Sequence, residues 1–225
     1  MFELKNVSVT LRGKTILRNV SCTIDKNDLI VIIGHNGAGK TTLFDCISGK
    51  IKPTSGSIFF EGKDITHTTE RERSKYLGRL FQNPQKNGVS CMTVHENLSM
   101  SLYKNNPIQL TYGTPALPQP LIEKVQRLSS SSSHVLETRM GNLSGGQRQL
   151  IAFLMATVYR PSLMLLDEPT AALDPIAATN LLENALETAQ SGITTLIITH
   201  DPELALTIGN KLWILQNGTI AKQYS

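Results

Sequence analysis

A continuously apolar segment runs straight into a glycine-rich loop, and this junction constrains the fold more than any other feature of the chain. Residues 29–33 read LIVII, residues 34–42 read GHNGAGKTT, and residues 40–48 have the composition of a helix that ends at Gly49. An uninterrupted apolar strand is typical of a parallel sheet that is covered on both faces. A strand, a GxxxxGK(S/T) loop and a helix in this order predict an α/β core whose loop binds phosphate.

The residue types of this loop match the chemistry of a phosphate group. Glycines let backbone N–H groups turn inward around phosphate oxygens, and the dipole of the following helix favours an anion at its N-terminus. Lys40 adds a positive charge near the β- and γ-phosphates, and Thr41 offers a hydroxyl to Mg²⁺. His35 and Asn36 are also typical of loop residues that face solvent. We assign as nucleotide-binding Gly34, His35, Asn36, Gly37, Ala38, Gly39, Lys40, Thr41 and Thr42.

Two later apolar strands also end in residues suited to phosphate chemistry. The stretch LMLLDE places Asp167 and Glu168 at the carboxyl end of one strand, and IITH places His200 at the end of the other. In open α/β sheets this edge is where ligands lie. Asp167 can hold Mg²⁺ directly or through water, and Glu168 can act as general base on a water in line with the γ-phosphate. His200 can donate a hydrogen bond to the γ-phosphate, while Gln82 can bring its amide to the metal or the water.

Two other parts surround this core in the sequence. Period-two alternation over residues 2–31, and again at residues 57–62, predicts a small antiparallel sheet. Residues 83–143 combine short helical stretches with a serine run at 129–133, whose composition is typical of a surface loop. We therefore expect a single domain, 1–225, with an α/β core at about 1–82 and 144–225 and a helical lobe inserted at about 83–143.

The C-terminal third predicts a helix and a hairpin. Asp174 can cap, and Pro175 can open, a helix between two apolar strands. We expect its apolar face to consist of Ala178, Leu182, Ala185, Leu186 and Ala189. The tail KLWILQNGTIAK predicts a hairpin with its tight turn at Asn217-Gly218.

Composition excludes several classes of protein. The 225 residues suffice for one compact domain, and no window approaches the roughly 18–20 apolar residues that span a bilayer, so we expect a chain that does not cross a membrane by itself. Cys22, Cys46 and Cys91 are far apart, which is typical of reduced thiols in the cytosol rather than of disulfides or a metal site. The net charge of +4 gives little information about partners.

A second glycine-paired loop lies about a hundred residues after the first. Residues 142–150 read NLSGGQRQL and open a helix that continues through QLIAFLMATVY. The N–H groups of Ser144, Gly145 and Gly146 therefore lie at a helix N-terminus, which makes this loop a second phosphate clamp. A single nucleotide has only one terminal phosphate to hold, so one bound nucleotide does not explain both loops.

Together these motifs resemble the ATP-binding cassette (ABC) ATPases along nearly the whole chain. Walker A corresponds to residues 34–42, Walker B to residues 163–167, the Q-loop glutamine to Gln82, the catalytic glutamate to Glu168 and the switch histidine to His200. The LSGGQ signature corresponds to Leu143, Ser144, Gly145, Gly146 and Gln147, and the D-loop to Ala172, Leu173 and Asp174. The resemblance implies ATP and Mg²⁺ as cofactors, with Thr41, Gln82 and Asp167 at the metal.

The resemblance also implies partners. In ABC proteins two chains pack head to tail, and each nucleotide lies between one Walker A and the partner's LSGGQ, so a homodimer would use both loops. The family implies a stand-alone uptake subunit, peripheral on the cytoplasmic face of a bacterial inner membrane. Its expected partners are an integral membrane permease and an extracytoplasmic solute-binding protein, and no nucleic acid is expected. The segments RLFQNP, TVHENL and LSGGQRQ favour small-solute import, such as that of amino acids. Two alternatives stay open: an ABC ATPase that acts on nucleic acid or ribosomes, and an ABC subunit that remodels the envelope.

The sequence departs from the family at one position. Many ABC domains stack adenine on an aromatic residue of the first strands, and Leu11 takes this place here. Aromatic stacking contributes roughly 1–3 kcal/mol per base in nucleic-acid complexes. We therefore expect weaker adenine affinity and looser discrimination against GTP.

Overall fold

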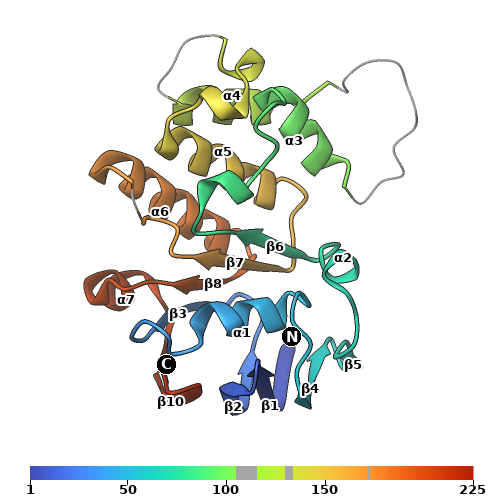
Figure 1. Ribbon diagram of the computed structural model, residues 1–225. Coiled ribbons are helices and arrows are strands. Elements are labelled where there is room, and N and C mark those ends of the chain that lie inside the picture. The colour runs from blue at the N-terminus through green and yellow to red at the C-terminus, as the bar shows by residue number, and fades with distance from the viewer. Residues whose placement is uncertain (105–115, 130–133, 172, 225) are drawn as a thin grey trace.

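A six-stranded sheet forms the centre of the protein. The computed structural model describes residues 1–104, 116–129, 134–171 and 173–224 (Figure 1). The strands follow the order β10-β9-β3-β8-β7-β6, in which β9 to β6 run parallel and β10 pairs antiparallel with β9. Their bounds are β3 (Leu29–Ile33), β6 (Leu77–Leu80), β7 (Leu163–Asp167), β8 (Thr194–Ile198), β9 (Lys211–Gln216) and β10 (Thr219–Tyr224). The predicted α/β fold with a mostly parallel sheet is confirmed.

Both faces of this sheet are covered, which explains why its strands are apolar without alternation. Leu163 and Leu165 of β7 belong to one buried cluster, whereas Met164 and Leu166 belong to another on the opposite face. On the first face lies α1 (Lys40–Ile47), and on the second lie α5 (Gly145–Thr157) and α6 (Pro175–Gln190), as Figure 1 shows. The short helix α7 (Pro202–Ile208) follows β8 and leads into β9.

The predicted antiparallel sheet is present beside the α1 face. Its strands are β1 (Phe2–Leu11), β2 (Lys14–Ile24), β4 (Ser55–Phe60) and β5 (Lys63–Asp64), in the order β2-β1-β4-β5. Phe2 packs on Phe60 with ring centroids 4.6 Å apart, and Phe60 stacks on Tyr76 at 4.2 Å. These rings connect the small sheet to the segment between the short helix α2 (Glu70–Arg73) and β6.

A helical layer lies on the far side of α5 from the central sheet (Figure 1). It contains α3 (Val94–Leu102), α4 (Gln119–Ser129) and the 3₁₀ turns η2 (Val135–Glu137) and η3 (Met140–Asn142), while the 3₁₀ turn η1 (Pro84–Lys86) follows β6. Val94 and Val125 pack in one cluster with Ile151 and Leu154 of α5. The packing of this layer therefore extends past residue 143, the expected boundary of the lobe. Of the serine run, residues 130–133 lie outside the described residues.

Several local expectations can be compared directly with the structure. Asp174 caps α6 by accepting a hydrogen bond from the Ala177 N–H at 3.0 Å, and the β9–β10 turn is at Asn217-Gly218, both with positive φ. The buried face of α6 agrees with the expected one in part, since Ala185 is buried and Leu186 and Ala189 pack against the same cluster. It differs in that Leu181, Asn184 and Thr188 are buried as well. Among the described residues, no helix combines the length and apolar character required to span a bilayer.

The three cysteines are unpaired, as expected. Cys22 and Cys46 are buried, and burial raises the pKa of their thiols to about 12 and about 11. Cys91 is exposed. The two buried thiols therefore act as small apolar side chains of the core rather than as nucleophiles.

Candidate functional site

The first glycine-rich loop joins β3 to α1 and is held by the C-terminal hairpin. Gly37 and Gly39 have φ values of 80° and 104°, which L side chains rarely adopt, so the loop needs glycine there. The Gly218 N–H at the tip of the hairpin donates to the Ala38 carbonyl at 3.0 Å. A Cβ at Gly218 would overlap the Ile16 carbonyl, so this contact also requires glycine. Sequence reasoning identified the turn but missed its contact with the loop.

Lys40 lies over the loop that precedes it. Its Nζ donates to the Gly34 carbonyl at 2.7 Å and to the His35 carbonyl at 3.2 Å. Burial lowers its pKa, against the raising effect of Glu168 and Asp167. The ammonium group is therefore placed where a phosphate enclosed by the loop can take over its hydrogen bonds, and such a phosphate would relieve the cost of burying the charge.

Thr41 and Asp167 face each other across the carboxyl edge of the sheet. The Thr41 hydroxyl donates to Asp167 Oδ1 at 3.5 Å, and Arg79 Nη2 lies 3.8 Å from Asp167 Oδ2. Burial raises the pKa of Asp167, while Arg79 and the Thr41 hydrogen bond act in the opposite direction. A hydroxyl and a single carboxylate fit Mg²⁺, which usually takes one or two protein oxygens and completes its shell with water and phosphate oxygens.

Glu168 is held between two side chains that come from other strand ends. Gln82 Nε2 donates to Glu168 Oε2 at 2.6 Å, and His200 Nε2 contacts Glu168 Oε1. Glu168 has a φ of 46°, an uncommon value for a non-glycine residue. The neighbouring carboxylates therefore have separate surroundings. One faces the Thr41 hydroxyl, and the other can accept a proton from a water.

Most of these groups line one cavity of about 650 Å³, although Gly34, His35 and Asp167 are not among its lining residues. Its wall includes all loop residues from 36 to 42, together with Gln82, Glu168 and His200. Lys14 and Ile16 of β2 also line it, which the sequence reasoning missed. Leu11 is 39% exposed and is not among the residues that line the cavity. Of the first two strands, β2 and not the end of β1 at Leu11 contributes to the wall.

The second glycine-paired loop stands apart from this cavity. Ser144 caps α5 in a reciprocal box, because its Oγ accepts from the Gln147 N–H at 3.2 Å while Gln147 Oε1 accepts from the Ser144 N–H at 3.1 Å. None of residues 143–147 lines the cavity. A Cβ added to Gly146 would lie 2.8 Å from Ala177 and 3.7 Å from Asp174, so the loop abuts the start of α6. Ala172 of the expected D-loop lies outside the described residues.

Comparison with known proteins identifies the family. The profile described as "ABC transporter" matches residues 17–171. The chain belongs to the ABC transporter ATP-binding family. It is 35% identical to the tyrosine transport ATP-binding protein of Clostridioides difficile (strain R20291), over 98% of this chain and 90% of that protein. ATP binding and hydrolysis follow from this membership.

Two further relatives agree with this assignment. The ABC chain is 34% identical to a probable branched-chain amino acid transport ATP-binding protein, LivG, of Methanocaldococcus jannaschii, over 91% of this chain and 81% of that one. The crystal structure of a nucleotide-free ATP-binding cassette from an ABC transporter superposes with a TM-score of 0.82 at 31% identity, over 99% of this chain and 90% of that one. The inferred P-loop fold is thereby confirmed.

Proposed function

We propose that this ABC ATPase powers the import of a small, amino-acid-like solute, as a head-to-tail homodimer bound to a membrane permease on the cytoplasmic face. The observation that carries the proposal is that the two carboxylates at the strand ends have separate partners. Thr41 and Asp167 form one pair, and Glu168 is fixed by Gln82 and His200 beside it. The relatives named for tyrosine and branched-chain amino acid transport support the class of cargo.

In this proposal each group has a defined task. The loop amides and Lys40 bind the β- and γ-phosphates, and Thr41 and Asp167 would hold Mg²⁺, which would neutralise phosphate charge when bound. Gln82 and His200 orient Glu168, whose carboxylate accepts a proton from the attacking water. Ile16 and Lys14 line the same cavity, and in this proposal they contact the nucleoside.

The separate position of the Ser144 loop supports the homodimer. Its helix N-terminus is suited to an anion, yet residues 143–147 do not line the cavity of the same chain. A second copy turned head to tail would bring its loop to the γ-phosphate of the first. Loss of that phosphate on hydrolysis would weaken the contact and let the halves part, which couples chemistry to movement.

Reconstitution tests the function. The protein is co-expressed with a candidate membrane subunit, the complex is inserted into liposomes together with a candidate solute-binding protein, and uptake of labelled tyrosine and leucine is measured with ATP on the side of the ATPase. We expect ATP-dependent uptake of at least one of these solutes, and none with Glu168→Gln. A protein that forms no membrane complex, and whose hydrolysis is stimulated by RNA or ribosomes, would instead act on nucleic acid.

A further inference from the structure

Arg79 lies between the carboxylate of Asp167 and the helix that follows the phosphate loop. It belongs to β6, and its side chain is only 6% exposed. Nη1 lies 2.7 Å from Asp45 Oδ1 and donates to the hydroxyl of Ser48, the C-cap of α1, at 3.1 Å. Nη2 lies 3.8 Å from Asp167 Oδ2 of β7. One guanidinium group therefore pairs with two carboxylates from two different elements.

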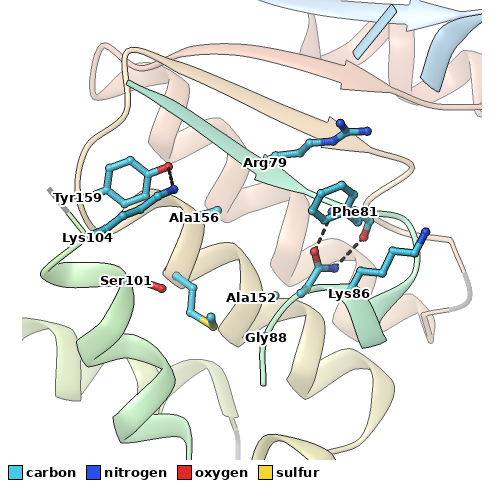
Figure 2. Close-up of a pocket in the computed structure, with 11 residues that line it drawn as sticks. Arg79, Phe81, Lys86, Gly88, Ser101, Lys104, Ala152, Ala156 and Tyr159 are labelled. Atoms are coloured by element: carbon cyan, nitrogen blue, oxygen red, sulfur yellow. Dashed lines mark hydrogen bonds between the residues drawn. The ribbon is translucent and has the colours of Figure 1, made fainter. Parts of the chain in front are cut away.

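Both carboxylates are largely cut off from water. The side chains of Asp45 and Asp167 are 12% and 5% exposed. A buried carboxylate is costly without a cation, and Arg79 is a cation that both share. Its guanidinium carbon lies 4.5 Å from the centre of the Phe81 ring, and Figure 2 shows the side chain extending over this ring and away from Lys104. The ring covers one side of the guanidinium group, so little water competes for it.

The helix α1 reaches both oxygens of the Asp167 carboxylate. Thr41 and Asp45 are one turn apart on α1, so they share a face of the helix. The Thr41 hydroxyl donates to Asp167 Oδ1 at 3.5 Å, and Asp45 reaches Oδ2 through Arg79. Contacts at both oxygens restrict the rotation of the carboxylate about its Cβ–Cγ bond. Its orientation is therefore set by the helix that begins at the phosphate loop.

The two ion pairs of Arg79 differ in length. The contact with Asp45 is at hydrogen-bond distance, whereas the contact with Asp167 at 3.8 Å is longer than a hydrogen bond. Asp45 therefore holds the guanidinium group back from Asp167. A guanidinium group in direct contact would use the same oxygen lone pairs that a metal ion needs. At the observed distance it compensates the charge of Asp167 and leaves those lone pairs available.

We propose that Arg79 and Asp45 are positioning residues that orient the Asp167 carboxylate for Mg²⁺ without occupying its oxygens. The inference rests on the proposed function, which assigns Mg²⁺ to Thr41 and Asp167. Neither Arg79 nor Asp45 lines the nucleotide cavity, so both act through Asp167. They should therefore contribute to the gain in nucleotide affinity that accompanies Mg²⁺ binding, and not to the affinity measured without the metal ion.

Equilibrium dialysis measures this gain without hydrolysis. The dissociation constant of an ATP analogue with nitrogen between the β- and γ-phosphorus atoms is measured in EDTA and in saturating Mg²⁺, and the ratio of the two constants is the gain. Arg79→Lys keeps a charge, but one ammonium group cannot fix two carboxylates, so the gain should fall at least about threefold. Asp45→Asn frees the guanidinium group to close on Asp167, and the gain should again fall at least about threefold. The constants in EDTA should stay near that of the wild type.

Two variants serve as matched controls. Lys50→Met removes a cation that lies 3.4 Å from Asp45 Oδ1 but leaves the contact between Arg79 and Asp167 in place. Glu70→Gln changes the net charge as Asp45→Asn does, at an exposed position of α2. Both variants should keep the gain within about twofold of the wild type.

The outcomes separate this inference from the proposed function. A wild type without the gain, or a gain that survives Asp167→Asn, overturns the assignment of Mg²⁺ to Asp167, and the inference falls with it. If the wild type shows the gain and Asp167→Asn abolishes it, a wild-type gain in Arg79→Lys and Asp45→Asn overturns the inference alone. A purely structural role would raise both dissociation constants together and leave their ratio unchanged, which overturns it as well. If Arg79→Lys does not fold, Asp45→Asn decides.

Discussion

Arg73 offers the sharpest test of how α1 is anchored behind the phosphate loop. Its side chain is fully buried and donates to four backbone carbonyls, those of Cys46, Ile47, Ile65 and Thr66, as well as to the Thr68 hydroxyl. Two of these carbonyls are at the C-terminal end of α1, where helix carbonyls lack intrahelical donors. One guanidinium group therefore hydrogen-bonds both to the C-terminal carbonyls of α1 and to carbonyls of the segment after β5.

The cost of removing this group can be worked out from its partners. The Cys46 and Ile65 carbonyls keep a second donor, from the Gly49 and Thr68 N–H groups. The Ile47 and Thr66 carbonyls would each lose the donor that Arg73 provides, at about 1–3 kcal/mol apiece. Methionine retains the apolar stem and avoids burying a charge, which offsets part of the loss.

We therefore expect Arg73→Met to lower the free energy of unfolding by about 3 kcal/mol. At about 2–4 °C per kcal/mol for a chain of this size, the midpoint of thermal unfolding should fall by about 6–12 °C. Urea titration followed by circular dichroism measures the free energy directly. The matched control is Arg71→Met on the same helix. Arg71 is exposed, so this substitution should change the free energy of unfolding by less than about 0.5 kcal/mol. A loss below about 1 kcal/mol for Arg73→Met, with an unchanged m-value, would refute the reasoning.

Four further expectations concern the site and the helical layer. Glu168→Gln should keep ATP binding in equilibrium dialysis but slow hydrolysis by roughly 10²- to 10⁴-fold, and near-normal turnover would remove it as the base. Ser144→Arg should leave ATP binding to a single chain nearly intact while abolishing hydrolysis, whereas a collapse of monomer binding would mean that the loop acts within its own chain. The rates of ATP and GTP hydrolysis should lie within about tenfold of each other. Leu11→Ala should barely change either rate, because Leu11 does not line the cavity. A strong preference for ATP that Leu11→Ala abolishes would contradict both expectations. Hydrogen bonds from Thr93 lower the pKa of Glu96 below its ordinary 4.5, so the capping box stabilises the fold above that pH and loses its effect as pH falls through the folded-state pKa. Glu96→Gln should therefore be less stable than the wild type at pH 7, and the difference in urea midpoint should shrink below pH 4.5.

Sequence predicts best those parts of the fold whose structure is determined by one local motif. The strand at 29–33 and the helix after the loop are placed within a residue of their observed bounds, because a buried strand and glycines that need positive φ leave few alternatives. The Asp174 cap and the Asn217-Gly218 turn follow from similar local chemistry. His200 lies two residues beyond the end of β8 yet still reaches Glu168, so the loop and not the strand aims its side chain.

Sequence reasoning is weaker where packing between distant segments decides. The face of α6 that is buried includes Asn184 and Thr188, because their side chains bond to carbonyls one turn earlier in the helix and need no water. A hydrophobicity pattern assigns such residues to the outer face. For the same reason the sequence does not predict that Arg79 and Arg73 are buried, because their burial depends on carboxylates and carbonyls from other elements. A basic residue in a sequence predicts exposure unless those partners are known.

Side chains from β6 and from the residues just after it contact both carboxylates of the site, Asp167 and Glu168. Arg79, within the strand, reaches Asp167, and Gln82, two residues after its last residue, reaches Glu168. The carboxylate proposed for the metal and the carboxylate proposed for the base are thus each held by a side chain from the same short segment. A displacement of β6 would therefore disturb both contacts together. A change confined to Gln82 would alter the contact with Glu168 and leave the Arg79–Asp167 contact unchanged. Simultaneous loss of both contacts would therefore indicate that β6 itself had moved.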